Sequence, residues 1–205
     1  MFITNYKASE EEQHRAMQAD AIVPNPIYTE TRAITIHAPV ERVWPWLAQM
    51  GSGRAGWYAY DWVDNGGRPS ATSILPEYQI IAPGDILPAL PGMKDIFLVS
   101  TVDPPCHLIL IVPDIISGPR VSWEFLLKPM DPGLTRLIVR GRVSPHWLAI
   151  VPQASYAPHG SQIFIERVYS LLAHLPRPIM LAAASFGHGL MNVRQLSGIK
   201  RRAEA

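Results

Sequence analysis

Asp61 and Asp64 are the residues of this sequence whose surroundings best suit acid–base chemistry. Both lie in segment 54–65, which also contains four aromatic side chains. A carboxyl group packed among aromatic rings loses solvation, and this raises its pKa toward the value that a general acid needs. We therefore take Asp61 as the first candidate catalytic residue. The four aromatic residues are Trp57, Tyr58, Tyr60 and Trp62.

These aromatic rings have two alternative roles. Trp and Tyr combine a large apolar area with one polar atom, which suits the wall of a pocket for an apolar ligand. The same rings would also fill the end of a hydrophobic core. If the segment is helical, Trp57, Tyr60, Asp61 and Asp64 share one side, and only one side can face a cavity. Both roles remain open at this point.

A second polar group lies near the end of the chain. His188, Asn192 and Gln195 are four and three residues apart, which places them on one stripe of a helix. Such a stripe supplies hydrogen bonds inside an apolar pocket, or it forms a solvated helix edge. Gly187 and Gly189 would allow a ligand or a strand to approach closely. His188 is the second candidate catalytic residue and Asn192 a candidate ligand contact.

Several classes of chemistry find no support in the sequence. The seven histidines form no metal-ligand spacing, and there is no nucleophile, dinucleotide or phosphate-loop motif. Cys106 is the only cysteine, which excludes an intramolecular disulfide and a Cys-rich metal site. We therefore expect no metal and no cofactor. The net charge of +1 predicts no nucleic-acid partner.

Composition and hydropathy indicate a globular protein, with 48% hydrophobic and 17% charged residues. The first residues lack the apolar core of a signal peptide. The least polar stretch, 178–191, is too short to span a bilayer. We expect a cytoplasmic location.

Twenty prolines mark the boundaries of the expected elements. Short joints between the later strands make them sequential antiparallel neighbours. Ser9 is expected to cap a short helix. The strands are expected at 31–37, 96–102, 107–112, 120–128 and 134–142, and the helices at 39–50, 161–175 and 178–202.

Alternation along two of these strands separates an apolar from a charged face. Trp123 lies on the apolar face, which is expected to cover the C-terminal helix, and is a candidate ligand contact. Glu124 lies on the opposite face, where it is expected to form cross-strand ion pairs with arginines. The arginines of that face are Arg136, Arg140 and Arg142.

Several segments resemble a bacterial, uncharacterised subgroup of the START-like superfamily, also called the SRPBCC or polyketide cyclase-like superfamily. The resemblance implies an α+β, helix-grip fold, in which a curved antiparallel β-sheet wraps around a long C-terminal α-helix. The segments that carry it are TRAITIHAP (31–39), VWPWL with QMG (43–51), RAGWY to DW and N (54–65), PEYQ before GD (76–85), SW (122–123), TRL with two arginines (135–142) and GIKRRAE (198–204).

This resemblance also sets the expected domain organisation. Residues 1–30 form an N-terminal helical extension, and residues 31–205 form a single helix-grip domain. An extra helical insertion at about 143–185 precedes the last helix and is apolar. We expect it to form a lid or a homodimer contact, in preference to a membrane contact.

The leading functional expectation is binding of a small hydrophobic molecule, a lipid, polyketide or aromatic metabolite, between the sheet and the C-terminal helix. One alternative is a cofactor-independent cyclase or dehydratase with Asp61 and His188 as acid–base residues. Another is a non-catalytic interaction protein whose cavity is filled. The candidate ligand contacts are Trp57, Tyr58, Tyr60, Trp62, Trp123 and Asn192.

Overall fold

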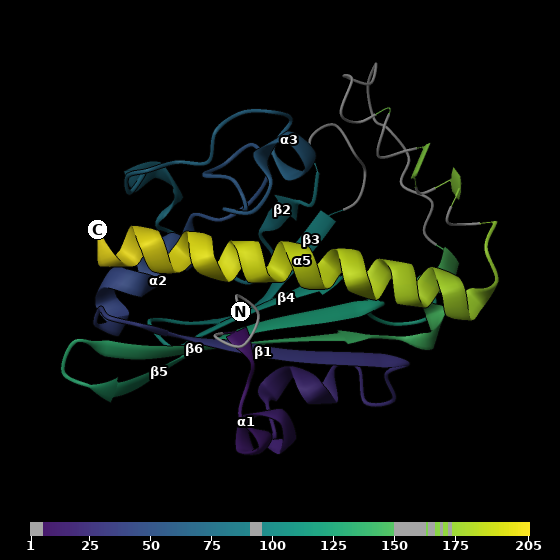
Figure 1. Ribbon diagram of the computed structural model, residues 1–205, viewed down its shortest axis with the longest axis horizontal. Coiled ribbons are helices and arrows are strands. Elements are labelled where there is room, and N and C mark those ends of the chain that lie inside the picture. Colours follow the sequence, from purple (N-terminus) through teal and green to yellow (C-terminus); the bar gives the residue numbers. More distant parts are fainter. Residues whose placement is uncertain (1–5, 91–95, 150–162, 164–166, 169, 172–173) are drawn as a thin grey trace.

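A six-stranded antiparallel sheet and one long helix dominate the computed structural model, which describes residues 6–90, 96–149, 163, 167–168, 170–171 and 174–205 (Figure 1). The strand order is β1-β6-β5-β4-β3-β2. Helix α5 (Arg177–Glu204) lies along one face of this sheet, as expected for a helix-grip fold. The strands are β1 (Tyr28–Ile36), β2 (Ile86–Pro88), β3 (Ile96–Asp103), β4 (His107–Val112), β5 (Val121–Asp131) and β6 (Leu134–Val143).

The predicted α+β helix-grip fold is confirmed by this strand order and by the position of α5. All predicted strands are present with small shifts of their ends, and only the three-residue strand β2 was not foreseen. The helix expected at 39–50 is α2 (Val40–Ala48), with Pro45 inside it. The helix expected at 161–175 and much of the predicted insertion lie outside the described residues.

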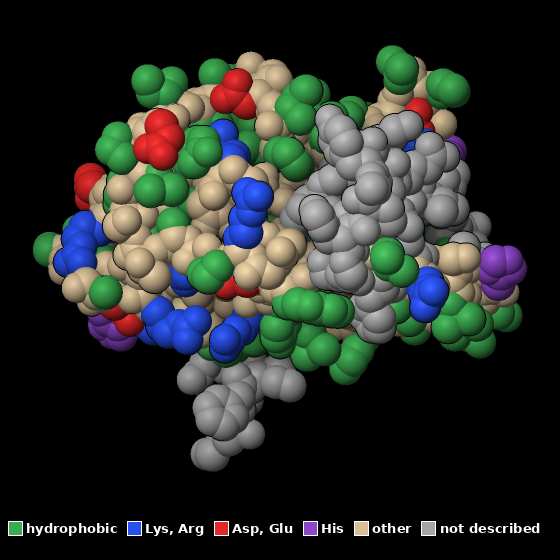
Figure 2. Space-filling view, turned by 90° about the horizontal axis from the view of Figure 1, so that it is seen from above, with side chains coloured by type: hydrophobic (Ala, Val, Ile, Leu, Met, Phe, Trp, Pro, Cys, Tyr) green, Lys and Arg blue, Asp and Glu red, His purple; other side chains and the backbone are tan. Residues whose placement is uncertain are grey.

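The two halves of α5 have different surroundings. Leu196, Ile199 and Ala203 belong to the core together with α2 and the sheet. At Gly198, a Cβ atom would lie 2.2 Å from the carbonyl oxygen of Tyr58, so only glycine permits this contact. The first half of α5 instead exposes apolar side chains, which gather on the right of the lower edge in Figure 2. These are Ile179, Phe186 and Leu190.

The outer face of the sheet is covered by the N-terminal segment, with helix α1 (Glu10–His14) and the 3-10 helix η2 (Gln18–Ala21). Ser9 caps α1, as predicted. A small second core lies beneath this cover. Its members are Ala8, Met17, Ala33, Leu126 and Ile138.

The ion pairs predicted on the outer face have different partners from those expected. Glu124 lies opposite Arg140 in the register, but its carboxylate accepts a hydrogen bond from the Ala19 N–H at 2.8 Å and lies 3.1 Å from the His107 ring nitrogen. The arginines pair instead with acids of the N-terminal segment. Arg136 binds Glu12 at 2.7 Å, and Arg140 and Arg142 bind Asp20 at 2.9 and 2.7 Å.

Candidate functional site

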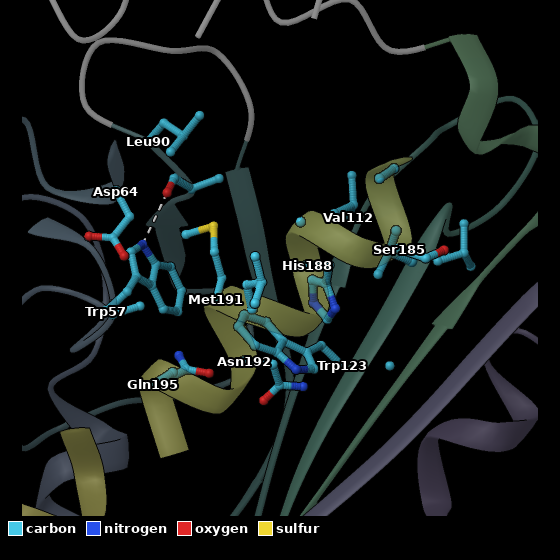
Figure 3. Close-up of a pocket in the computed structure, with 18 of the residues that line it drawn as sticks. Trp57, Asp64, Leu90, Val112, Trp123, Ser185, His188, Met191, Asn192 and Gln195 are labelled. Atoms are coloured by element: carbon cyan, nitrogen blue, oxygen red, sulfur yellow. Dashed lines mark hydrogen bonds between the residues drawn. The ribbon is translucent and has the colours of Figure 1, made fainter. Parts of the chain in front are cut away.

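A cavity of about 620 Å³ lies between α5 and the inner face of the sheet, and its described lining is mostly apolar (Figure 3). This volume is within the range of small-molecule sites. Strands β1, β3, β4, β5 and β6, helix α3 (Asp61–Asp64) and the part of α5 from Leu181 to Gln195 all contribute to the lining. The cavity is therefore formed where α5 separates from the core.

The floor of the cavity follows from the strand register. Glu30 of β1 lies opposite Gly141 of β6, which in turn lies opposite Trp123 of β5. Gly141 has no side chain, and a Cβ atom there would lie 3.8 Å from the His188 ring. The imidazole of His188 therefore sits over this glycine, with its ring centre 5.8 Å from that of Trp123.

The aromatic run of the sequence contributes two of its four rings to the cavity. Trp57 lines it, donates its indole N–H to the Ala89 carbonyl at 3.0 Å, and packs on Phe97 and Trp123 with ring centres 5.4 and 5.8 Å apart. Tyr60 also lines the cavity and is half exposed.

The other two rings lie elsewhere. Tyr58 is buried in the core, where its hydroxyl donates to the Trp46 carbonyl at 3.1 Å and burial raises its pKa. Trp62 is exposed on α3 and is not part of the described cavity lining. Tyr58 has a φ angle of 60°, so the chain reverses there and the segment before α3 is not helical.

The two acids of the run also separate. Asp61 accepts hydrogen bonds from the backbone N–H and the hydroxyl of Ser70, which fixes the loop after α3, and it is not in the described cavity lining. Asp64 lines the cavity and is 1% exposed. One of its carboxylate oxygens accepts the Tyr60 N–H at 3.0 Å, while Oδ1 makes no hydrogen bond within the described protein. Burial raises the pKa of Asp64 to about 6.

His188 lies at the mouth of the cavity and is tied to the sheet by Glu30. Its Nδ1 atom is 3.2 Å from the Glu30 carboxylate, which also pairs with Arg32. Burial opposes ionisation of Glu30, but the His188 hydrogen bond and the Arg32 charge outweigh it, so the pKa of Glu30 is lowered. Gly189 leaves room for the side chain of Arg32. Any other residue at position 189 would place its Cβ atom 2.8 Å from Arg32 Nη2. The close neighbours of Gly189 are thus side chains of β1, and, apart from the adjacent helix backbone, no atom of the described protein lies within 4 Å of a Cβ at Gly187.

Asn192 and Gln195 face the inner part of the cavity from α5 (Figure 3). Each residue is 2% exposed. Neither polar atom of the Asn192 amide makes a hydrogen bond within the described protein, and the same holds for Gln195 Oε1 and for the indole N–H of Trp123. The Gln195 amide nitrogen lies 3.7 Å from the Met50 sulfur. Of the helix stripe predicted from the sequence, Asn192 and Gln195 thus lie inside the fold, whereas His188 is exposed.

Sequence reasoning missed two residues that shape this site, Glu30 and Gly141, and it chose Asp61 over Asp64 as the candidate catalytic acid. Strand alternation within 28–36 would have placed Glu30 on the inner face, but nothing local indicated that it meets His188. Among the described residues, no group of three His, Cys, Asp or Glu side chains could hold a metal ion. No helix within the described ranges is long and apolar enough to cross a membrane.

No model of a known protein family matches the chain, and no curated protein matches it. Solved structures similar to it include CalU16 from Micromonospora echinospora, with 11% identity, a TM-score of 0.37, and coverage of 86% of this chain and 83% of that one. The Polyketide_cyc-like protein Cgl2372 from Corynebacterium glutamicum has 16% identity, a TM-score of 0.41, and coverage of 84% and 89%. DynU16, from the dynemicin biosynthetic locus, has 17% identity, a TM-score of 0.38, and coverage of 71% and 44%. Proteins of the polyketide cyclase-like kind are thus among the similar structures, while the fold assignment rests on the strand order and α5.

Proposed function

We propose that this protein binds a small, largely apolar molecule in the cavity between α5 and the inner face of the sheet. The observation that carries this proposal is the cavity of about 620 Å³, whose described lining is mostly apolar yet includes buried polar atoms without partners. An interior filled by its own side chains would offer no such space. Binding of an apolar ligand there is favoured because it removes apolar surface from water.

Native mass spectrometry of the protein purified from its source tests this proposal directly. We expect a bound mass that organic extraction removes. Ala184→Leu enlarges a side chain that lines the cavity, whereas Ala182→Leu makes the same change on the exposed side of α5. Ala184→Leu should lower the bound fraction about tenfold or more, and Ala182→Leu should leave it unchanged. Equal occupancy in both variants would place the ligand elsewhere.

Acid–base catalysis on the bound molecule is a second candidate function, favoured by one observation. The Asp64 carboxyl group lines the cavity, has a pKa of about 6, and keeps one oxygen without a hydrogen bond. Such a group exchanges protons near neutral pH. The extracted ligand, returned to fresh protein, should change mass with the wild-type protein and not with Asp64→Asn. An unchanged ligand in both samples would leave binding as the function.

A further inference from the structure

The buried polar atoms of the cavity define what the ligand must offer. Five such atoms make no hydrogen bond within the described protein. Two are donors, the Trp123 indole N–H and the Asn192 amide nitrogen, and three are acceptors, one each on Asp64, Asn192 and Gln195. A buried polar atom without a partner is costly, so a ligand group that satisfies these atoms gains affinity.

The positions of these atoms concentrate the polar contacts at one end. Asn192 and Gln195 lie on successive turns of α5, next to Leu196, which is fully buried in the core. Trp123 faces them from β5, and Figure 3 shows the three side chains on the same side of Met191. The polar end of a ligand would therefore lie deep in the cavity, with its apolar part toward the mouth.

The charges around the cavity disfavour an anionic ligand. Among the described lining residues, none is Lys or Arg, and the acid Asp64 belongs to the wall. A carboxylate or phosphate buried here would have no cation beside it. His188 is a cationic candidate, but it lies at the mouth and is paired with Glu30. Figure 3 shows Asp64 apart from Asn192 and Trp123, so a cation at this end would have no carboxylate beside it either, and the polar end of the ligand has to be neutral.

We propose that the ligand is an uncharged apolar molecule bearing a hydroxyl group, and that Asn192, Gln195 and the Trp123 indole N–H bind this hydroxyl. A hydroxyl both donates and accepts, which matches the mixture of donors and acceptors at this end. It donates to an amide oxygen of Asn192 or Gln195 and accepts from Trp123 or from the Asn192 amide. This inference rests on the proposed binding function and adds the chemical class of the ligand.

Four probes that share one ring system test this assignment by quenching of tryptophan fluorescence. Hydroxypyrene, methylpyrene, pyrene carboxylate and aminomethylpyrene differ only in the substituent on the ring. We expect hydroxypyrene to bind about tenfold more tightly than methylpyrene, and the two charged probes to bind more weakly than either. Tightest binding by the carboxylate, by the amine or by methylpyrene would overturn the hydroxyl assignment and leave cavity binding intact. If no probe binds, the proposed function itself fails.

Substitution of Asn192 tests whether this residue causes the preference for hydroxypyrene over methylpyrene. Asn192→Leu keeps the shape of the side chain and removes both polar atoms, so the advantage of hydroxypyrene over methylpyrene should disappear. Gln195→Met is a second variant if the first does not fold, and it should reduce the same advantage several-fold. Asn25→Leu, in the exposed bend before β1, is the matched control and should preserve the full difference. An unchanged preference in both cavity variants would contradict the proposed contacts.

Discussion

Buried polar side chains on the two sides of the sheet differ in whether they have hydrogen-bond partners. On the outer face, the Arg140 guanidinium is almost buried and donates to Thr31, to Asp20 and to three backbone carbonyls of the N-terminal segment. Glu124 is fully buried there and also has partners. On the inner side, Trp123 of β5 and Asn192 of the facing helix α5 are also buried, yet their side-chain polar atoms have no partner within the described protein.

This contrast separates polar groups that hold the fold from polar groups that are available to a ligand. Nearly all buried polar groups of folded proteins are hydrogen-bonded, so a cluster of unpaired ones calls for an explanation. On the outer face, Arg140 and Glu124 follow that rule through their contacts with the N-terminal segment. Removal of a polar group should therefore destabilise the protein on the outer face and be tolerated on the inner face.

The largest effect is expected for Arg140→Met. The substitution leaves Asp20 and several carbonyl groups without their donor, so the free energy of unfolding should fall by about 3–5 kcal/mol. Urea denaturation measures this change. Arg201→Met, on an exposed part of α5, is the control and should stay within about 0.5 kcal/mol of the wild type. A small loss for Arg140→Met would remove the contrast between the two faces.

Asp64→Asn should instead raise the free energy of unfolding. Because burial raises the pKa of Asp64 to about 6, the folded protein favours the protonated acid, and this contribution is lost as the pH rises through that value. The variant should therefore gain up to about 3 kcal/mol over the wild type at pH 8 and almost nothing at about pH 3, below the ordinary pKa of an aspartate. Thermal or urea unfolding at both pH values measures this difference in stability. Asp131→Asn, exposed at the end of β5, is the control.

Asn192→Leu should raise the free energy of unfolding by about 1 kcal/mol in the absence of ligand, because an unpaired buried amide is replaced by an apolar group of similar shape. Differential scanning calorimetry of extracted protein measures this gain. Asn25→Leu is again the matched control and should be neutral. A loss of several kcal/mol for Asn192→Leu would mean that its amide stabilises the fold.

The smallest change in the free energy of unfolding is expected for Glu30→Gln. Glu30 pairs with His188 on the inner side of the sheet, at the exposed mouth of the cavity. The pKa of Glu30 is lowered, so its contribution is present above the ordinary pKa of a glutamate and is lost as the pH falls through the folded value. Since His188 is partly exposed, the loss at pH 7 should be below about 1 kcal/mol. The difference from wild type should vanish in acid, whereas Glu77→Gln, exposed in the 3-10 helix η3 (Pro76–Tyr78), should be neutral throughout.

Much of the architecture was accessible from the sequence, because it depends on local periodicity. Alternation placed Trp123 on the inner face, and the spacing of Asn192 and Gln195 placed them on one stripe of a helix. These patterns depend on regular geometry of strands and helices, which a single sequence records directly.

The details of the aromatic run and of the outer face were not accessible in this way. Helical spacing placed Asp61 and Asp64 on one side, but Tyr58 adopts a positive φ angle and helix α3 begins only at Asp61. Both acids belong to α3, but Asp61 binds Ser70 while Asp64 lines the cavity, and the spacing of the two residues does not record this difference. The partners of Arg140 lie more than a hundred residues away in the chain, and no local pattern records such a contact.

The close contact at Gly198 has a mechanical consequence for the long helix. The end of α5 near Gly198 is fixed against Tyr58, while its first half packs beside the cavity and exposes apolar side chains. Nearer to its first turn, α5 also contacts β1 through the His188–Glu30 pair and through Gly189 against Arg32, so a tilt of the helix would displace most the turns beyond these contacts. At a rise of 1.5 Å per residue, a tilt of about 5° moves the first turn of α5 by about 3 Å. A small tilt of α5 at this glycine would therefore change the width of the cavity mouth.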